Sequence, residues 1–188
     1  MTGLRGTIAR IIGPPRSREE IHASDVLQEQ RLWDAVLQAT GNPLLIHFLA
    51  ELIEKANIPP RDPEKLARAI QLYSARKIKF FRERPERFQH PLRTIVWGLG
   101  DCDDKSIFVA TALRSFRVPT RLRFLRIKLG PERTLGHVYP LAFIAGKWIP
   151  LESVREYPWG YDPEVCAREK GFEVSTRTIG DSPDTLHA

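Results

Sequence analysis

The apolar residues of this chain change their spacing near Pro119, and this change limits the fold more than any other feature of the sequence. After Pro119, the stretch TRLRFLRIKLG (residues 120–130) alternates basic and apolar side chains, which is typical of a half-buried strand. Before it, apolar residues recur three and four positions apart, as in amphipathic helices; the clearest run is Leu44, Leu45, Phe48, Leu49, Leu52 and Ile53. The sequence therefore predicts an α+β fold, with a helical N-terminal half followed by a helix packed on an antiparallel β-sheet.

Local signals mark where the helices begin. Asn42 and Asp62 each precede a proline, a pairing that suits an N-cap followed by the first helical residue. Ser17 stands three residues before Glu20, which is the spacing of a capping box. Asp101 is a suitable N-cap for a further helix that ends before Val118-Pro119.

The strands that follow are bounded by turn residues. We expect two more strands over 138–144 and 147–151, joined by a tight turn at Ala145-Gly146. In the strand over 120–130 the alternation slips by one position between Phe124 and Leu125, which predicts a β-bulge.

These elements predict one domain with two extensions. Residues 1–16 form a basic N-terminal arm, and residues 17–155 form the α+β domain, of which 17–62 is a helical extension and 63–155 the core. Residues 156–188 show no clear period and are predicted to be an irregular C-terminal extension. A chain of 188 residues is long enough to bury a core of this size without metal or disulfide cross-links.

Composition and charge exclude several classes of protein. Hydrophobic residues make up 42% and charged residues 28%, which excludes a disordered or fibrous chain. No apolar run approaches the roughly 20 residues that cross a bilayer, and the start does not resemble a secretory signal. We therefore expect no membrane contact and a cytoplasmic location.

The two cysteines and the basic residues predict neither a disulfide nor a nucleic-acid partner. Cys102 and Cys166 lie in unlike surroundings, which suits a reducing compartment. The net charge of +6 is modest. The basic side chains of residues 121–133 are interpreted as the solvated side of a half-buried sheet rather than as a nucleic-acid surface.

The segment WGLGDCDDK places Cys102 at a predicted helix N-terminus, where the helix dipole favours a thiolate. A nucleophilic cysteine also needs a base and a group that orients the base. His137 begins the second predicted strand and Glu152 follows the third. Because residues opposed across antiparallel strands lie about 5 Å apart, the last two are plausible neighbours.

Three nearby carboxylates oppose this interpretation, since Asp101, Asp103 and Asp104 raise the pKa of a neighbouring thiol. Consecutive side chains on a helix point about 100° apart. We therefore expect Asp103 and Asp104 to face the helix amides or the solvent while Cys102 faces His137, so that an imidazolium contact outweighs the acids.

The segments GLGDCDDKSIFVATALRSFRVPTRLRFLRI and GHVYPLAFIAGKWIPLES resemble the core of the transglutaminase-like superfamily. The family pattern is a G-x-C at a helix start, an R-x-x-x-[IV]-P-[AT]-R turn into a strand, an H-[VAC]-[YW], and a W-x-x-[LF]-[DE]. Every block is present in order, over about residues 66–152. The G-D-C-D-D form resembles small members encoded in phages and prophages, which would place the protein in the host cytoplasm or in a virion.

The resemblance implies a papain-like fold with Cys102 as nucleophile, His137 as base and Glu152 as the orienting carboxylate. The family usually has aspartate at the last position, so Glu152 is a departure. The oxyanion hole would use the backbone amide of Cys102 and a side-chain donor. Trp97 and Gln89 are the two candidates for that donor.

Each of these residues also has a plainer interpretation. A lone cysteine is usually a packing residue, a lone carboxylate such as Glu152 is usually on the surface, and Trp97 is commonly a core aromatic. Helix capping explains the aspartates without a cation. A zinc site of Cys102, His137 and Glu152 lacks a fourth ligand, so we predict no metal and no cofactor.

The sequence thus predicts cysteine-dependent acyl transfer on a peptide or protein amide. We expect hydrolysis rather than cross-linking, because water is always available and no feature marks an amine site. The alternative is a non-catalytic structural or assembly protein, for example of a phage particle, that keeps the fold as a scaffold. Its partners would bind through the N-terminal helices or the C-terminal tail.

Overall fold

The computed structural model describes residues 18–59, 61–81 and 88–184, with side chains from Asp25 onward. The helices of this part of the chain are α2 (Arg18–Ala39), α3 (Pro43–Lys55), α4 (Pro63–Lys77), α5 (Pro91–Trp97), α6 (Cys102–Ser115) and α7 (Pro163–Glu169). The strands are β1 (Lys79–Phe80), β2 (Leu99–Gly100), β3 (Thr120–Gly130), β4 (Arg133–Ile144), β5 (Lys147–Pro150) and β6 (Glu173–Gly180).

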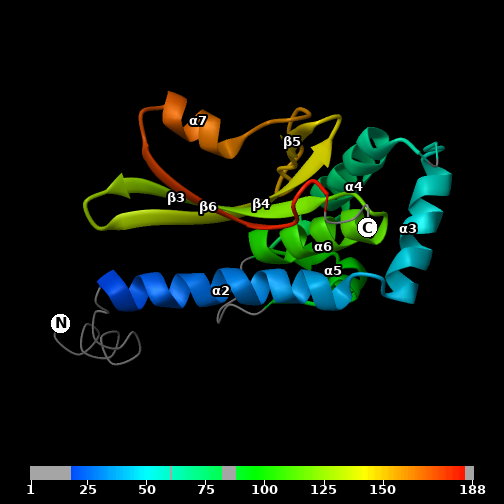
Figure 1. Ribbon diagram of the computed structural model, residues 1–188, viewed down its shortest axis with the longest axis horizontal. Coiled ribbons are helices and arrows are strands. Elements are labelled where there is room, and N and C mark those ends of the chain that lie inside the picture. Colours follow the sequence, from blue (N-terminus) through cyan, green and yellow to red (C-terminus); the bar gives the residue numbers. More distant parts are fainter. Residues whose placement is uncertain (1–17, 60, 82–87, 185–188) are drawn as a thin grey trace.

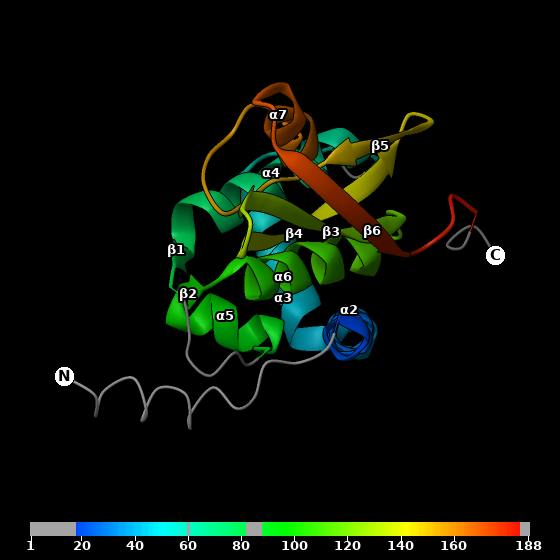
Figure 2. The same cartoon turned by 90° about the vertical axis from the view of Figure 1, so that its left-hand side faces the viewer.

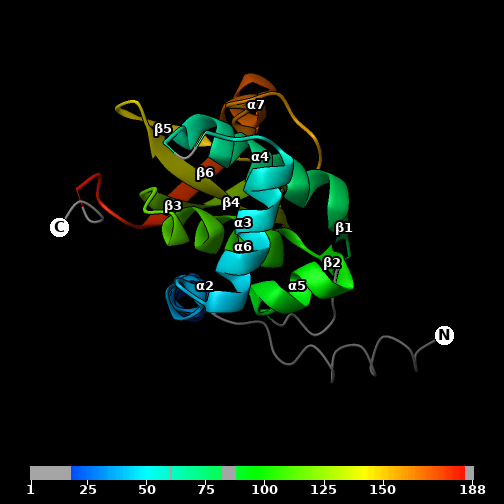
Figure 3. The ribbon, with the colours of Figure 1, turned by 90° about the vertical axis from the view of Figure 1, so that its right-hand side faces the viewer.

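One antiparallel sheet in the order β5-β4-β3-β6 forms the centre of the fold. Helix α6 lies against one face of the sheet with the long helix α2 beside it, and α7 lies over the other face (Figures 1 and 2). Helices α3, α4 and α5 also pack on α6, and α3 crosses in front of it in Figure 3. Strands β1 and β2 form a separate parallel pair just before α6. The α+β fold that the sequence predicts is confirmed.

Helix α6 is buried on every side along most of its length. The residues from Asp104 to Leu113 are all buried. Phe108, Val109 and Ala112 pack in the cluster shared with α3 and α4, whereas Ile107 and Ala110 pack against α2 and β3. A helix enclosed in this way has little freedom to shift, because protein interiors are close-packed. Its N-terminus is therefore a fixed point in the molecule.

The helix starts expected at Asn42 and Asp62 are present in the structure. The Asn42 side chain accepts hydrogen bonds from the amides of Leu44 and Leu45, and Asp62 accepts one from the amide of Lys65. The expected strands over 138–144 and 147–151 correspond to β4 and β5, and β4 begins five residues earlier than predicted. The capping box at Ser17 and the arm over 1–16 lie outside the described residues.

The β-bulge predicted between Phe124 and Leu125 is wrong. Pairing of β3 with β4 is regular from Thr120 to Lys128, and the register shifts only between Lys128 and Gly130. The apparent slip arises because β3 lies in the middle of the sheet with apolar neighbours on both faces. Phe124 packs in the cluster that contains α2 and α6, whereas Leu125 packs with Tyr139 on the opposite face.

The segment over 156–188 is not irregular as predicted, since it contains α7 and β6. Strand β6 pairs with β3 along its whole length, from Glu173 to Gly180. Its sequence, EVSTRTIG, gave no signal because it is an edge strand in which no residue is fully buried. The boundaries between the domain and its two extensions stay a prediction.

Within the described residues, no single helix is both long and apolar enough to span a membrane. The part of α2 from Asp25 onward and α3 meet that criterion only when taken together, and the two are bent by 79° at their junction.

A buried ion pair fixes the end of β6 to the core. Asp181 pairs with Arg114 of α6 and accepts a hydrogen bond from the amide of Thr120 at 3.0 Å. Both paired side chains are almost fully buried. Loss of one partner leaves the other charged and without its counter-ion in the interior.

We therefore expect Asp181→Ala to lower the free energy of unfolding by about 3 kcal/mol, as measured by urea denaturation. The matched control is Glu173→Ala, which breaks the exposed pair of Glu173 with Lys128 and is expected to cost less than about 1 kcal/mol. Equal effects of the two variants would contradict this assignment.

Candidate active site

The start of α6 is held by a reciprocal capping box. The Asp101 side chain accepts hydrogen bonds from the amides of Asp103 and Asp104, at 3.0 and 3.3 Å, and Asp104 accepts one from the Asp101 amide at 3.3 Å. Asp104 also accepts from the backbone amide and the side-chain amide of Gln89, at 2.8 and 3.0 Å. Cys102 is thereby fixed as the first residue of the helix.

Cys102 faces a cavity of about 420 Å³ that opens between α2, the start of α6 and the strands β3 and β4. His137 lines the same cavity. The other polar lining residues are Asp25, Gln28, Glu29, Asp101, Asp103 and Arg126. A cavity of this size that holds a thiol and an imidazole is large enough for part of a peptide.

His137 and Glu152 are in direct contact. Nε2 of His137 pairs with Oε2 of Glu152, whose side chain is 4% exposed. The other oxygen, Oε1, accepts a hydrogen bond from the amide of Val154 at 2.8 Å. Gln71 donates to the backbone carbonyl of Glu152 at 2.7 Å. With Nε2 engaged in this way, Nδ1 is the ring nitrogen left to exchange a proton with a substrate or a thiol.

The carboxylate of Asp103 contacts the sulfur of Cys102, which differs from the expected orientation of Asp103 toward the helix amides or the solvent. Sγ lies 3.5 Å from Oδ1 of Asp103 and donates to it, so Asp103 is a neighbour of the sulfur and not a residue turned to solvent. Among the described residues, no hydrogen bond joins Cys102 to His137. A hydrogen bond from the backbone of Val138, the residue after His137, does reach Cys102.

This arrangement reverses the expected effect on the thiol. Burial raises the pKa of Cys102, and the carboxylates of Asp103 and Asp101 raise it further, whereas the Val138 hydrogen bond lowers it. The expectation of a thiolate favoured by the helix N-terminus is therefore wrong for this structure. Burial and two adjacent negative charges outweigh a partial positive charge at the helix end.

Neither candidate for the oxyanion hole has a place at the cavity. Trp97 is 49% exposed, and its ring lies under the guanidinium of Arg93 at 3.7 Å. Gln89 is buried with its side-chain amide donating to Asp104, so that donor group serves the helix cap. The backbone amide of Cys102 keeps its place at the helix start, where the first amides point out of the helix.

Lys105 is a polar residue of the site that the sequence analysis missed. It is fully buried one turn after Cys102, and Nζ donates to the carbonyls of Ile78 and Val154 at 2.7 and 3.1 Å. Burial lowers its pKa to about 8, while the nearby Glu152 carboxylate acts in the opposite direction. The sign in the sequence is a lysine two residues before the mainly apolar run Ile107–Leu113.

Two acidic residues of α2 were missed as well. Asp25 and Glu29 line the cavity and pair with Arg126 and Arg177 of the sheet, the second pair at 3.3 Å. Their spacing of four residues puts them on the same face of α2 as Leu32. A carboxylate pair on the buried side of a helix is the signal that could have revealed them.

Possible metal ligands occur together only at the helix start, within the part of the chain that the structure describes. One ligand atom each from Asp101, Cys102 and Asp103 lies within 4.8 Å of the others. Asp101 accepts the two cap hydrogen bonds, and Cys102 donates to Asp103. Helix capping therefore accounts for this cluster.

Comparison with known proteins gives a family match over the same region. Residues 51–153, more than half of the chain, match the transglutaminase-like superfamily. A crystal structure of a candidate cysteine protease from Cytophaga hutchinsonii is similar, with a TM-score of 0.49 and 14% identity over 73% of this chain and 47% of that one. This chain thus spans about half the length of that protein. The comparison with curated proteins gave no match.

Replacing Asp103 tests the origin of the raised pKa of Cys102. Asp103→Asn removes one of the negative charges beside the sulfur, so the pKa of Cys102 falls. We expect the rate of alkylation by iodoacetamide to begin rising at a lower pH in the variant than in the wild type. Cys166 serves as the internal control and keeps its profile. Identical Cys102 profiles would show that Asp103 does not act on the thiol.

The lowered pKa of Lys105 predicts that the free energy of unfolding rises with pH in the alkaline range. Its pKa is about 8 in the folded chain against an ordinary value of 10.5, so between these values the unfolded chain binds more protons. The free energy of unfolding therefore gains up to about 1.4 kcal/mol per pH unit in that range. Urea denaturation from pH 7 to 10.5 should show this gain in the wild type and not in Lys105→Met. If the stability of the wild type and of Lys105→Met changed with pH in the same way, burial would not lower the pKa of Lys105.

Proposed function

Because this chain belongs to the transglutaminase-like superfamily, as its motifs predicted, we propose that it uses Cys102, His137 and Glu152 in acyl transfer on peptide or protein amides. The observation that carries the proposal is the contact between His137 and Glu152 beside a cavity that also contains Cys102. A thiol, an imidazole and a buried carboxylate in this order form the set that nucleophilic catalysis requires. The family match supports a cysteine-enzyme scaffold, and these three residues would carry out the reaction.

The proposed reaction has two halves. His137 takes the thiol proton on Nδ1 while the sulfur attacks the amide carbonyl, forming the C–S bond and a tetrahedral oxyanion. The backbone amide of Cys102 stabilises that oxyanion. The C–N bond then breaks, and the amine leaves with the proton from His137. Water attacks the thioester with His137 as the base, releasing the carboxylic acid and restoring the thiol.

Glu152 has a defined part in this sequence. Its contact with Nε2 sets the tautomer of His137 and stabilises the imidazolium that forms during proton transfer. The extra methylene relative to aspartate does not prevent this contact. The Val154 amide at 2.8 Å holds the second carboxylate oxygen and so fixes the direction of the first.

The raised pKa of Cys102 determines when the proton moves. A thiol surrounded by carboxylates stays protonated in the free protein, so a preformed thiolate–imidazolium pair is not part of the proposal. The sulfur instead leaves Asp103 and gives its proton to His137 as the substrate enters the cavity. We propose water as the acceptor of the acyl group, which makes the activity a hydrolysis.

The second candidate function is a non-catalytic scaffold, for example in a phage particle. The contact of Sγ with Asp103 favours it, because a protonated and partly buried thiol is a poor nucleophile. The two functions differ in whether Cys102 accepts an acyl group from a reactive ester.

We therefore expect p-nitrophenyl acetate to acetylate Cys102 and the adduct to turn over by hydrolysis. The measurement is p-nitrophenol release together with mass spectrometry of the tryptic peptide. Cys166→Ala is the matched control and keeps the activity, whereas Cys102→Ala loses it. Loss of His137 is expected to slow acetylation by at least about 100-fold.

Acetylation of Cys102 and Cys166 at similar slow rates, with no effect of His137→Ala, would support the scaffold instead. Peptide and cell-wall amides tested next with the wild type and Cys102→Ala, by mass, would identify the class of amide that is cleaved.

A further inference from the structure

We propose that Tyr139 and Asp162 are positioning residues that hold the His137 ring in the orientation in which it meets Glu152. Asp162 lies beyond residues 51–153, the region that matches the family. The C-terminal segment around α7 thereby completes the candidate active site. The importance of this orientation rests on the proposed function, but the orientation itself can be measured without any activity.

Tyr139 covers one flat side of His137. The two residues are separated by one position on β4, so their side chains lie on the same face of the sheet. Their ring centroids are 5.9 Å apart, and the ring planes differ by 25°. Tyr139 itself is 1% exposed. The histidine ring is thus limited on its face by Tyr139 and at Nε2 by Glu152.

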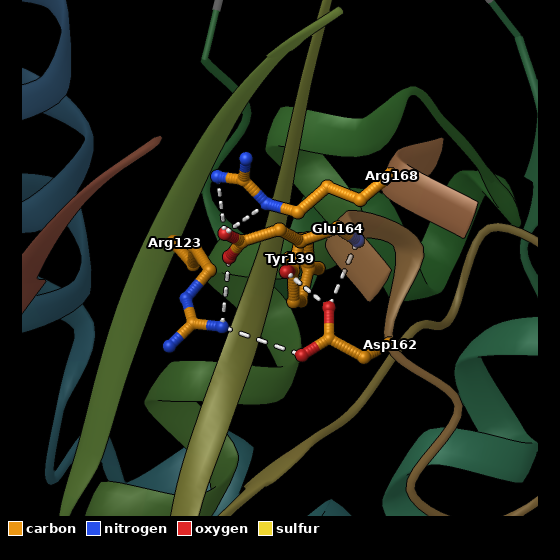
Figure 4. A network of polar contacts seen from close by, with 5 residues as sticks. All are labelled: Arg123, Tyr139, Asp162, Glu164 and Arg168. Carbon is orange, nitrogen blue, oxygen red and sulfur yellow. Dashed lines mark hydrogen bonds and ion pairs between the residues drawn. The ribbon is translucent and has the colours of Figure 1, made fainter. Parts of the chain in front are cut away.

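Asp162 fixes the far end of the tyrosine. The hydroxyl of Tyr139 donates to Oδ1 of Asp162 at 2.7 Å, and the same oxygen accepts the amide of Glu164 at 2.9 Å as the N-cap of α7. The other oxygen pairs with Nη1 of Arg123 at 3.3 Å, and Glu164 pairs with the same nitrogen at 3.2 Å (Figure 4). Asp162 is therefore held by two groups, the Glu164 amide of α7 and the Arg123 guanidinium of β3, in addition to the tyrosine.

The chemistry of Tyr139 suits this role. Burial raises its pKa, and Asp162 raises it further, so the hydroxyl remains a hydrogen-bond donor. A phenylalanine would fill the same space and keep the stacking surface. The hydroxyl adds a directed hydrogen bond to Asp162, which fixes the position of the tyrosine ring along β4. A small displacement of a proton-transfer group is costly to a reaction, so a fixed ring matters at this position.

The network could also serve only to attach α7 to the sheet, and the two roles predict different results. If it only attaches α7, its loss lowers stability without affecting the ring of His137. If it positions the histidine, the ring loses its single orientation even in variants that remain folded. Control variants must therefore remove a tyrosine hydroxyl and an N-cap aspartate at sites away from His137.

The experiment measures the ring of His137 by NMR in the full chain labelled with ¹³C-histidine. The chain has five histidines, and the signal of His137 is assigned by its loss in His137→Gln. Tyr139→Phe removes the hydroxyl, and its matched control is Tyr157→Phe, whose ring stacks on Tyr161. Asp162→Ala removes an N-cap, and its control is Asp62→Ala, which removes the N-cap of α4.

We expect one narrow Cε1 signal in the wild type and in both controls, and relaxation dispersion or a second signal in Tyr139→Phe and Asp162→Ala. Asp162→Asn keeps an oxygen acceptor for the tyrosine and is expected to restore the single signal. If the wild type is acetylated at Cys102, the same two variants should slow that step about fivefold, the effect of one lost hydrogen bond.

An unchanged His137 signal in a folded Tyr139→Phe variant would overturn the inference, and so would equal broadening in Tyr157→Phe. Should Asp162→Ala fail to fold, Tyr139→Phe and Asp162→Asn still decide the question. Failure of the proposed function would instead show as absence of acetylation in the wild type, with the NMR result unaffected. The two hypotheses can therefore fail separately.

Discussion

The buried carboxylate of Asp104 is the constraint on which the rest of the site depends. It accepts hydrogen bonds from Asp101 and twice from Gln89, and it has no exposure to solvent. A buried charge is tolerated only when donors replace its hydration, so the segment before α6 has to close around it. The hydrogen bonds to Asp104 fix the first turn of α6. Because α6 is packed against the sheet, the position of this turn relative to the sheet is fixed as well. Cys102 therefore has a fixed position at the cavity that β3 and β4 also line.

The same cap creates an electrostatic conflict. The aspartates that stabilise the start of α6 also surround the sulfur and keep the thiol protonated. On the strand side, His137 is held by Glu152 and Tyr139, and Lys105 binds the carbonyl of Val154, whose amide holds Glu152. The structure thus has an imidazole in contact with Glu152 and Tyr139, at a cavity that also holds a protonated thiol. We infer that this is a resting arrangement, in which movement of the sulfur from Asp103 toward His137 begins the reaction.

Much of this could be predicted from the sequence, because the signals are local. Helix caps at Asn42 and Asp62 depend on neighbouring residues, and the motif blocks made His137 and Glu152 plausible neighbours across a hairpin. What failed depended on distant contacts. Leu125 looked like a slip in register because α7 covers the second face of the sheet. The raised pKa of Cys102 depends first on burial by distant segments, which helix geometry alone does not reveal. Asp162, to which we assign a positioning role, lies in the C-terminal segment, whose strand β6 has almost no apolar pattern.

The most direct measurement of the central claim is a crystal structure of the protein after iodoacetamide has alkylated Cys102. The added group occupies the cavity as an acyl group would. If the sulfur and the histidine act together, Nδ1 of His137 will lie within about 3.5 Å of the modified sulfur or its carbonyl group, a hydrogen-bond distance, with Nε2 still on Glu152. A modified sulfur that stays beside Asp103, with the imidazole beyond reach of the adduct, would contradict the claim.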